Sequence, residues 1–332
     1  MKEESIRPEK IFKKYLALAK KDAIAYFKDI PFTRHPCPAC KSIKSTFAFR
    51  KLGFDYEECN DCGTLYANSR PSADAFCRYY SDAPSVVYWA THFYKVTEDA
   101  RREKLIRPKA VAVSRLIEKY YGPFPKRACV ADAGAGYGVF CEELSALLPR
   151  GIPTIAIEPS PSLIQICKDK NIETIPKFLE DVTKADFKNK TVVAIVSFEL
   201  LEHLHSPDDF IQTCSDLLDS GGLLILTTLN WQGFDLQILR EHSNSIHPPH
   251  HINFFNTASI QVLLQRHGFE ICEVTTPGKL DVDIVSKQLQ DVTCPFIREL
   301  LSLSDDAVRE KLQAILQETR TSSHMMIVAR KK

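Results

Sequence analysis

Four cysteines near the amino terminus form two pairs whose spacing suits a metal ion. Cys37 and Cys40 are separated by two residues, as are Cys59 and Cys62, and Gly63 follows directly. Two such pairs on a short hairpin can bring four thiolates to one ion, usually tetrahedral Zn²⁺, and glycine tolerates the positive φ of a tight turn. The alternative is four structural cysteines or two disulfides. The spacing predicts a structural zinc site, because four sulfur ligands leave no position for water or substrate.

A glycine-rich turn follows an apolar run in the middle of the chain. The segment VADAGAGYGVF contains Asp132, Gly134, Gly136 and Gly138. A strand ending at Asp132 and a helix opening at the glycines would place a ligand at the carboxyl edge of a parallel sheet. Dinucleotide-binding enzymes use a similar turn, but a carboxylate just before it would repel a pyrophosphate. The pattern therefore favours a ligand with an ammonium group and no phosphate.

Carboxylates at the ends of the next two expected strands could complete this ligand site. Glu158 ends the segment IAIEPS, where a carboxylate can accept hydrogen bonds from both hydroxyls of a ribose. Glu180 and Asp181 follow the third expected strand, where a carboxylate could accept from an adenine amino group. The alternative for each is a capping or solvated acid at a strand end.

A second group of titratable residues follows the fourth expected strand. In FELLEHLH, Glu199, Glu202 and His203 would share one face of a helical turn. HPPHHINFF, after the fifth strand, brings further histidines to the same sheet edge: His247, His250 and His251. Carboxylates and imidazoles could hold Mg²⁺ or Mn²⁺ at Glu199, Glu202 and His203, or form a general base with an orienting acid. Backbone bonding and capping are the alternative. We expect His203 or His251 to take a proton.

Alternating strands and helices must position these residues. From ACVADAG to LLILTTLN, near-continuous apolar runs alternate with amphipathic stretches, as in a buried parallel sheet with helices on both faces. Two late strands, FEICEVTT and HMMIVARKK, flank a polar segment at 278–323 that we expect to be helical. The fold class is α/β, a doubly wound, Rossmann-like sheet whose last strand is antiparallel.

Changes in composition divide the chain into four parts. We expect an N-terminal helix over 1–35, a zinc ribbon over 36–70, an aromatic helical connector over 71–125 and a larger domain over 126–332.

The overall composition argues against several classes of protein. The formal net charge is +1, so no global field favours nucleic acid or an anionic membrane. The charged N-terminus lacks the apolar core of a signal sequence, and no apolar run approaches the length of a bilayer span. The 11 cysteines therefore indicate reduced thiols rather than a disulfide framework. We expect a cytoplasmic protein without membrane insertion.

Taken together, these motifs resemble those of the class I S-adenosylmethionine-dependent methyltransferases. The resemblance covers about 127–330 and rests on DAGAGYG, IAIEPS, FELLEHLHSPDDF, LLDSGGLLILTTLN and HHINFFNTASIQVLLQRHGFEI. It implies the seven-stranded sheet of that fold, with S-adenosylmethionine as cofactor.

The resemblance also implies roles for particular residues. Asp132 and the three glycines of the turn would contact the methionine part of the cofactor. Glu158 would hold the ribose, and Asp181 or its neighbour the adenine. Ser197 to Leu200 would form the wall beside the methyl group.

The zinc segment narrows the expected substrate. A C-x-x-C…C-x-x-CG segment before a tyrosine-rich helix and this domain resembles bacterial methyltransferases linked to sugar, polysaccharide or secondary-metabolite modification. Quinone O-methylating and small-RNA end-methylating relatives with a similar E-x-x-E-H use a divalent ion there. We expect a small-molecule or sugar-type acceptor, methylated at a hydroxyl.

Two other classes of function stay open. An RNA or protein methyltransferase could use the zinc ribbon for recognition, because KSIKSTFAFRK is basic with interleaved aromatics. The near-zero net charge argues against extended contact with nucleic acid. An NAD-dependent oxidoreductase is the third alternative.

Overall fold

The computed structural model describes residues 2–332, and its largest element is a seven-stranded sheet that carries the glycine turn. The strand order is β12-β13-β10-β9-β6-β7-β8. The strands are β6 (Ala128–Ala133), β7 (Thr154–Ile157), β8 (Glu173–Ile175), β9 (Thr191–Phe198), β10 (Leu223–Leu229), β12 (Phe269–Thr275) and β13 (His324–Lys331). Neighbours from β8 to β10 run parallel, whereas β13 is antiparallel to both β10 and β12. The predicted Rossmann-like, doubly wound sheet with an antiparallel last strand is confirmed.

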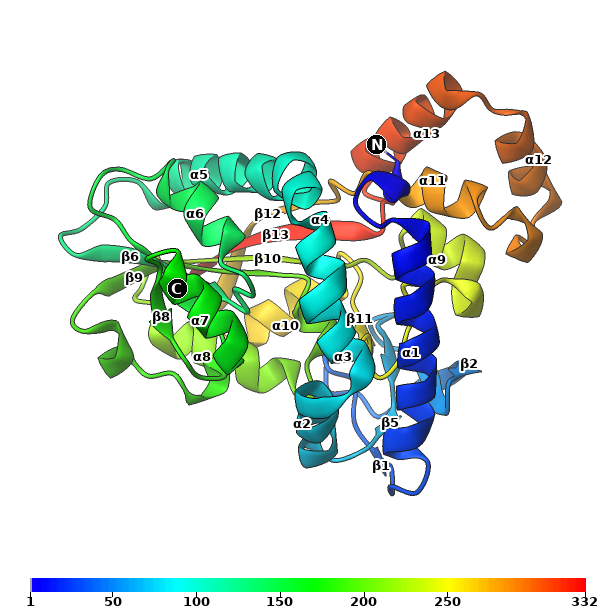
Figure 1. Cartoon of the computed structure of the whole chain (residues 1–332), viewed down its shortest axis with the longest axis horizontal. Coiled ribbons are helices and arrows are strands. Elements are labelled where there is room, and N and C mark those ends of the chain that lie inside the picture. The colour runs from blue at the N-terminus through cyan, green and yellow to red at the C-terminus, as the bar shows by residue number, and fades with distance from the viewer. Residues whose placement is uncertain (1) are drawn as a thin grey trace.

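Helices cover both faces of this sheet (Figure 1). The covering helices are α5 (Arg107–Tyr121), α6 (Val139–Ser145), α7 (Pro161–Asp169), α8 (Pro207–Leu217) and α10 (Ser259–Arg266). Val130 packs with the buried side chains of α5 and α6, while its neighbour Ala131 packs with those of α8 and α10. Because side chains alternate across a strand and both faces are covered, these strands are apolar throughout.

The paired cysteines lie in a second sheet, with strand order β11-β4-β3-β2. Its strands are β2 (Ser45–Lys51), β3 (Phe54–Cys59), β4 (Leu65–Ala67) and β11 (Asn253–Phe254). Beside it, β1 (Thr33–Arg34) pairs with β5 (Ser69–Arg70). Because β11 comes from the larger domain, the ribbon completes its sheet only with a strand from much later in the chain. The domain boundaries remain a prediction.

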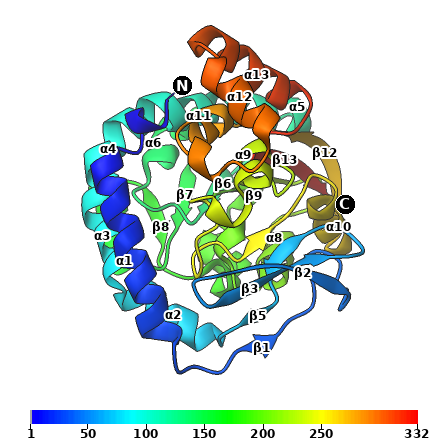
Figure 2. The same ribbon diagram turned by 90° about the vertical axis from the view of Figure 1, so that its right-hand side faces the viewer.

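Helices from the first third of the chain form a wall along one side of the molecule (Figure 2). They are α1 (Glu9–Phe27), α2 (Ala73–Asp82), α3 (Pro84–Tyr88) and α4 (Tyr94–Arg101). Two π-helical segments, Trp89–Phe93 and Arg102–Ile106, bracket α4 within an unbroken helical stretch from α3 to α5. Such segments are uncommon and often lie at functional sites.

A helical excursion joins β12 to β13. It contains α11 (Asp281–Ser286), α12 (Pro295–Leu303) and α13 (Asp306–Glu318), and α9 (Phe234–Leu239) packs against α11. Short 3₁₀ turns elsewhere are Glu3–Ser5, Leu179–Asp181, Lys184–Phe187, Leu201–His203, Arg240–His242 and Leu289–Asp291. Within residues 2–332, every helix is too short or too polar to cross a membrane.

Candidate functional site

The glycine turn joins β6 to α6 at the carboxyl edge of the large sheet. Gly134, Gly136 and Gly138 have φ values of 80°, 55° and 68°, in the left-handed region that favours glycine. A Cβ on Gly138 would lie 2.5 Å from Ile172 Cδ1 and 2.9 Å from Cys167 Sγ, so a side chain would clash there. A Cβ on Gly136 would meet nothing within 4 Å. The turn is therefore packed at its helix end and open at its centre, where a ligand can approach the backbone.

Glu158 is held against this turn by backbone donors. Its Oε2 accepts a hydrogen bond from the Gly136 amide and its Oε1 accepts one from the Ser160 amide, both at 3.0 Å. The residue is 7% exposed, and burial raises the pKa of its carboxyl group. Each carboxylate oxygen keeps a second lone pair, so the side chain can accept two further hydrogen bonds.

Asp132 and Ser197 lie at the ends of neighbouring strands beneath the turn. Asp132 is 3% exposed, and Cys141 Sγ donates to its Oδ2 at 3.5 Å. Burial raises the pKa of Asp132 to about 7, so a nearby cation would favour its charged form. The Ser197 hydroxyl donates to the Ala133 carbonyl at 2.9 Å and so ties β9 to β6. Asp181 lies exposed in the 3₁₀ turn after β8.

The connector helix is fastened over the glycine turn. The ring of Tyr137, between the second and third glycines, stacks on Tyr94 of α4 with centroids 4.3 Å apart. Its hydroxyl donates to the Ala90 carbonyl, and Lys170 Nζ donates to its carbonyl oxygen at 3.0 Å. The glycine turn is therefore hydrogen-bonded both to the connector and to Lys170, the C-cap residue of α7.

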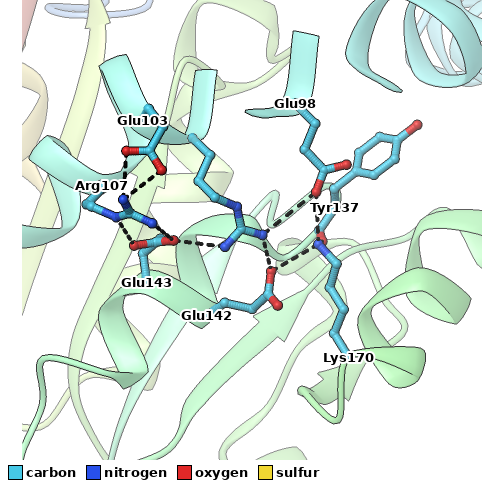
Figure 3. Close-up of polar contacts among 8 residues, drawn as sticks. Glu98, Glu103, Arg107, Tyr137, Glu142, Glu143 and Lys170 are labelled. Carbon is cyan, nitrogen blue, oxygen red and sulfur yellow. Dashed lines mark hydrogen bonds and ion pairs between the residues drawn. The ribbon is translucent and has the colours of Figure 1, made fainter. Parts of the chain in front are cut away.

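Ion pairs extend this attachment (Figure 3). Arg102 pairs with Glu142 at 2.7 Å and with Glu143 at 2.8 Å, both on α6. Lys170 pairs with Glu142 at 3.0 Å and with Glu98 of α4 at 3.3 Å. The network ties the connector to α6 and α7, the two helices that flank the turn.

Glu202, His203 and His251 come together after β9. One ligand atom from each lies within 4.8 Å of the others, and the two imidazole rings meet edge to face at 4.6 Å. Thr228 Oγ1 donates to Glu202 Oε2 at 2.7 Å. Burial, with the charge of Glu199, raises the pKa of Glu202 to about 8, so its carboxyl group is largely protonated at neutral pH.

His251 is oriented as a proton acceptor. Its Nδ1 lies 2.5 Å from the Ser245 carbonyl oxygen, which can only accept a hydrogen bond, so we assign the ring proton to Nδ1. Burial lowers the pKa of His251 to about 4, so the ring is neutral at pH 7 and its Nε2 can accept a proton. His203 Nδ1 instead lies 3.3 Å from the Tyr80 hydroxyl, a contact that permits either tautomer.

Glu199 stands apart from this cluster. The chain turns at Glu199 with a φ of 51°, and its Oε2 lies 3.0 Å from His324 Nδ1. Thr227 Oγ1 donates to its Oε1 at 2.8 Å, and Lys109 Nζ lies 3.8 Å from that oxygen. Burial would raise the pKa of Glu199, but His324 and Lys109 outweigh it and hold that pKa well below its usual range. The structure therefore brings together Glu202, His203 and His251, and pairs Glu199 with His324 instead.

Several of these partners lie outside any motif that the sequence analysis identified. His324 begins the last strand, and only the position of β13 beside β10 brings it to Glu199. Lys109 reaches the site from α5, one of the helices that cover the large sheet.

The other two histidines of the HPPHHINFF segment lie in different surroundings. His250 Nε2 lies 2.7 Å from the Tyr79 hydroxyl, while His247 Nε2 is buried with no hydrogen-bond partner among residues 2–332.

The four paired cysteines are arranged as a metal site. Sγ atoms lie 3.5 Å apart in the pairs Cys37–Cys62 and Cys40–Cys59, and all four lie within 4.8 Å of one another. Four Zn–S bonds of about 2.3 Å in a tetrahedron require sulfur atoms about 3.8 Å apart, which fits. Gly63 has a φ of 68°, and its amide donates to the Cys59 carbonyl at 2.8 Å, which closes the second turn.

This ribbon bonds directly to the segment that carries His251. The Tyr56 hydroxyl donates to the His251 carbonyl at 2.6 Å, and the Ala67 amide donates to the Ile252 carbonyl at 2.9 Å. The Ile252 amide in turn donates to the Glu202 carbonyl at 2.9 Å. The ribbon therefore supports the backbone of the titratable cluster.

Comparison with known proteins identifies one matching family. The family described as "Methyltransferase domain" matches residues 101–274, which is more than half of the chain. Two curated relatives are both named ubiquinone biosynthesis O-methyltransferase. The protein of Bradyrhizobium diazoefficiens is 32% identical over 115 residues, covering 33% of this chain and 44% of its own length. That of Xanthomonas axonopodis pv. citri is 27% identical over 168 residues, covering 46% and 66%. The match thus spans less than two thirds of either relative.

Solved structures also align with the chain. A methyltransferase of Thermotoga maritima, described as a possible histamine N-methyltransferase, aligns with a TM-score of 0.43 at 14% identity, covering 72% of this chain and 98% of its own. A geranyl diphosphate C-methyltransferase of Streptomyces coelicolor A3(2) aligns with a TM-score of 0.46 at 13% identity, covering 71% and 84%.

Proposed function

The chain belongs to the methyltransferase-domain family, and from this premise we propose that it uses S-adenosylmethionine to methylate a hydroxyl group of a small-molecule or sugar-type acceptor. The observation that carries the proposal is the Glu202, His203 and His251 cluster, in which His251 Nε2 is free to accept a proton. The alternative acceptor is an RNA or a protein recognised through the ribbon.

The residues around the glycine turn suit this cofactor. Bound there, S-adenosylmethionine supplies a methyl group that its sulfonium already activates. Glu158 would accept the ribose hydroxyls, Asp132 and the glycine backbone would bind the methionine part, and Asp181 or Glu180 would accept from the adenine. Burial raises the pKa of Asp132 to about 7, so its carboxyl group would be charged beside an ammonium group.

The residues that face the acceptor must remove one proton from its hydroxyl group. As the acceptor oxygen forms its bond to the methyl carbon and the carbon–sulfur bond breaks, the hydroxyl proton would pass to His251 Nε2. A weak base suffices because the oxygen becomes more acidic as the new bond forms. The Ser245 carbonyl would hold the resulting imidazolium, and His203 would orient the hydroxyl from the opposite side.

Replacing Glu158 by Ala should weaken the binding of S-adenosylhomocysteine by about 1–3 kcal/mol, because two hydrogen bonds to a charged acceptor are lost. Titration calorimetry measures this change, and Glu270→Ala, an exposed acid on β12, is the matched control. Tight binding of NAD by the unaltered protein, with no heat from S-adenosylhomocysteine, would refute the assigned cofactor.

The acceptor class is tested by labelled methyl transfer. The protein is incubated with methyl-labelled S-adenosylmethionine and a cell lysate, which is then separated into small-molecule and polymer fractions. We expect the label in the small-molecule fraction. Label confined to RNA or protein would establish the alternative and contradict the proposal.

The same cluster could also hold a divalent ion, because Glu202, His203 and His251 offer three ligand atoms. One carboxylate and two imidazoles suit Mg²⁺ poorly, since this ion prefers oxygen ligands. We therefore expect Mg²⁺ or Mn²⁺ added to metal-depleted protein to leave the rate of methyl transfer unchanged. The zinc content is measured in parallel, so that loss of the ribbon metal is not mistaken for loss of a catalytic ion. Activity that depends on added Mn²⁺ or Mg²⁺ would assign the cluster to metal chemistry.

A further inference from the structure

Three basic side chains, Lys109, Arg101 and Arg7, carry charges that act on one another and on the titratable residues after β9. Lys109 of α5 lies with its Nζ 3.8 Å from Glu199 Oε1 and 4.5 Å from the ring centroid of Phe198, and it donates to Thr227 Oγ1 at 3.3 Å. Burial lowers the pKa of Lys109, and the charge of Glu199 acts in the opposite sense.

The other two cations are arginines with unsatisfied donors. Arg101, the last residue of α4, lies over the ring of Tyr94 at 5.4 Å. Arg7 lies over Phe12 at 5.5 Å, and its Nη1 meets Glu3 Oε1 at 3.4 Å. Within residues 2–332, the Nε atoms of both arginines are buried and lack a hydrogen-bond partner. Such donors are uncommon in folded proteins, where a bound ion, a ligand or an ordered water satisfies them.

These cations share the space around the titratable cluster. The N-terminal segment lies beside α4 and α11 in both views (Figures 1 and 2), and the Glu3 amide donates to Asp283 of α11 at 2.8 Å. The positive charge of Arg7 lowers the pKa of His251 and that of Arg101. The negative charge of Glu199 acts in the opposite sense on the pKa of both.

The negative charges nearby do not balance the positive ones. Glu199 is shared between Lys109 and His324, and Glu3 is shared between Arg7 and Lys287. Partly buried cations whose charge is incompletely paired are costly, and a guanidinium matches the two oxygens of a carboxylate or phosphate.

We propose that the acceptor carries a carboxylate or phosphate group, which binds between Arg7, Arg101 and Lys109 while its hydroxyl faces His251. This inference rests on the proposed function and specifies its substrate class. The anion accepts hydrogen bonds from the Nε atoms of Arg7 and Arg101, and its negative charge offsets the excess positive charge of the three side chains.

Matched probes test this inference without knowledge of the acceptor. Titration calorimetry on the S-adenosylhomocysteine complex compares benzoate with benzyl alcohol, and phenyl phosphate with phenol. We expect one of the two anions to bind about tenfold more tightly than its neutral partner, as for a charge-assisted hydrogen bond. The stronger anion identifies carboxylate or phosphate as the preferred group. Arg101→Gln and Arg7→Gln should each abolish the preference, whereas Arg115→Gln, an exposed change on α5, should preserve it.

Three outcomes separate the possibilities. Equal affinity within both pairs, including no measurable binding of any probe, would overturn the inference. It would also be overturned if Arg101→Gln weakened S-adenosylhomocysteine but not 5′-methylthioadenosine, because the anion would then be the carboxylate of the cofactor. Failure of the unaltered protein to bind S-adenosylhomocysteine would instead refute the proposed function itself.

Discussion

Replacing His251 by Ala should lower kcat by about 10²- to 10⁴-fold, the range for loss of a positioned general base. The affinity for S-adenosylhomocysteine should stay unchanged, because only the transition state uses the proton transfer. His203→Ala should cost less, since His203 lacks the carbonyl contact that fixes the tautomer of His251. Single-turnover rates with saturating cofactor measure the difference, and His242→Ala in the Arg240–His242 turn is the control.

The pH dependence gives a second readout of the same residue. Burial lowers the pKa of His251 from 6.5 to about 4 in the folded protein, so folding favours the neutral ring. The stability contributed by this neutral ring is fully present above pH 6.5 and is lost as the pH falls toward 4, whereas the folded protein keeps the ring neutral until the pH approaches 4. The rate should therefore stay level from neutral pH to about pH 5 and decline below. Full activity in His251→Ala, or an acid limb centred near pH 6.5, would count against this base.

Removing the ribbon metal should have the largest effect on stability. Binding of structural zinc contributes about 10–16 kcal/mol in small zinc domains, so its loss unfolds such modules. We expect about one zinc per chain, held by Cys37, Cys40, Cys59 and Cys62. Cys59→Ser should lose the metal, unfold the ribbon and raise hydrogen exchange at 251–254, because Tyr56 and Ala67 bond that segment.

The cofactor side should survive this change. The glycine turn and Glu158 bond to the connector, α6 and α7 rather than to the ribbon, so S-adenosylhomocysteine affinity should be largely retained. Cys77→Ser, at an exposed cysteine of α2, should leave both the metal and the hydrogen exchange unchanged. Metal analysis that finds no zinc in protein produced with zinc present would end this assignment.

Local sequence was sufficient for the features set by spacing along the chain. The paired cysteines, the glycine turn and the strand ends at Asp132 and Glu158 depend on neighbouring residues, and the structure places each at the expected edge or turn. The antiparallel last strand followed from two late apolar runs around a polar segment.

Features set by contacts between distant elements could not be predicted in this way. The spacing of E-x-x-E-H suggested one face for Glu199 and Glu202, but the positive φ at Glu199 and the arrival of His324 separate them. The pairing of β11 with the ribbon depends on sheet register, which no local motif encodes. The basic cluster of Arg7, Arg101 and Lys109 likewise joins the helical stretch that contains α4 and α5 to the bend between the Glu3–Ser5 turn and α1.

We expect the methyl group to be delivered to the cluster of Glu202, His203 and His251. A crystal structure of the S-adenosylhomocysteine complex tests it most directly. We expect the Glu158 carboxylate to accept the ribose hydroxyls and the sulfur to face the cluster, with space for one hydroxyl between the sulfur and His251 Nε2. A sulfur that points away from both histidines, or a cofactor bound elsewhere than the glycine turn, would contradict it.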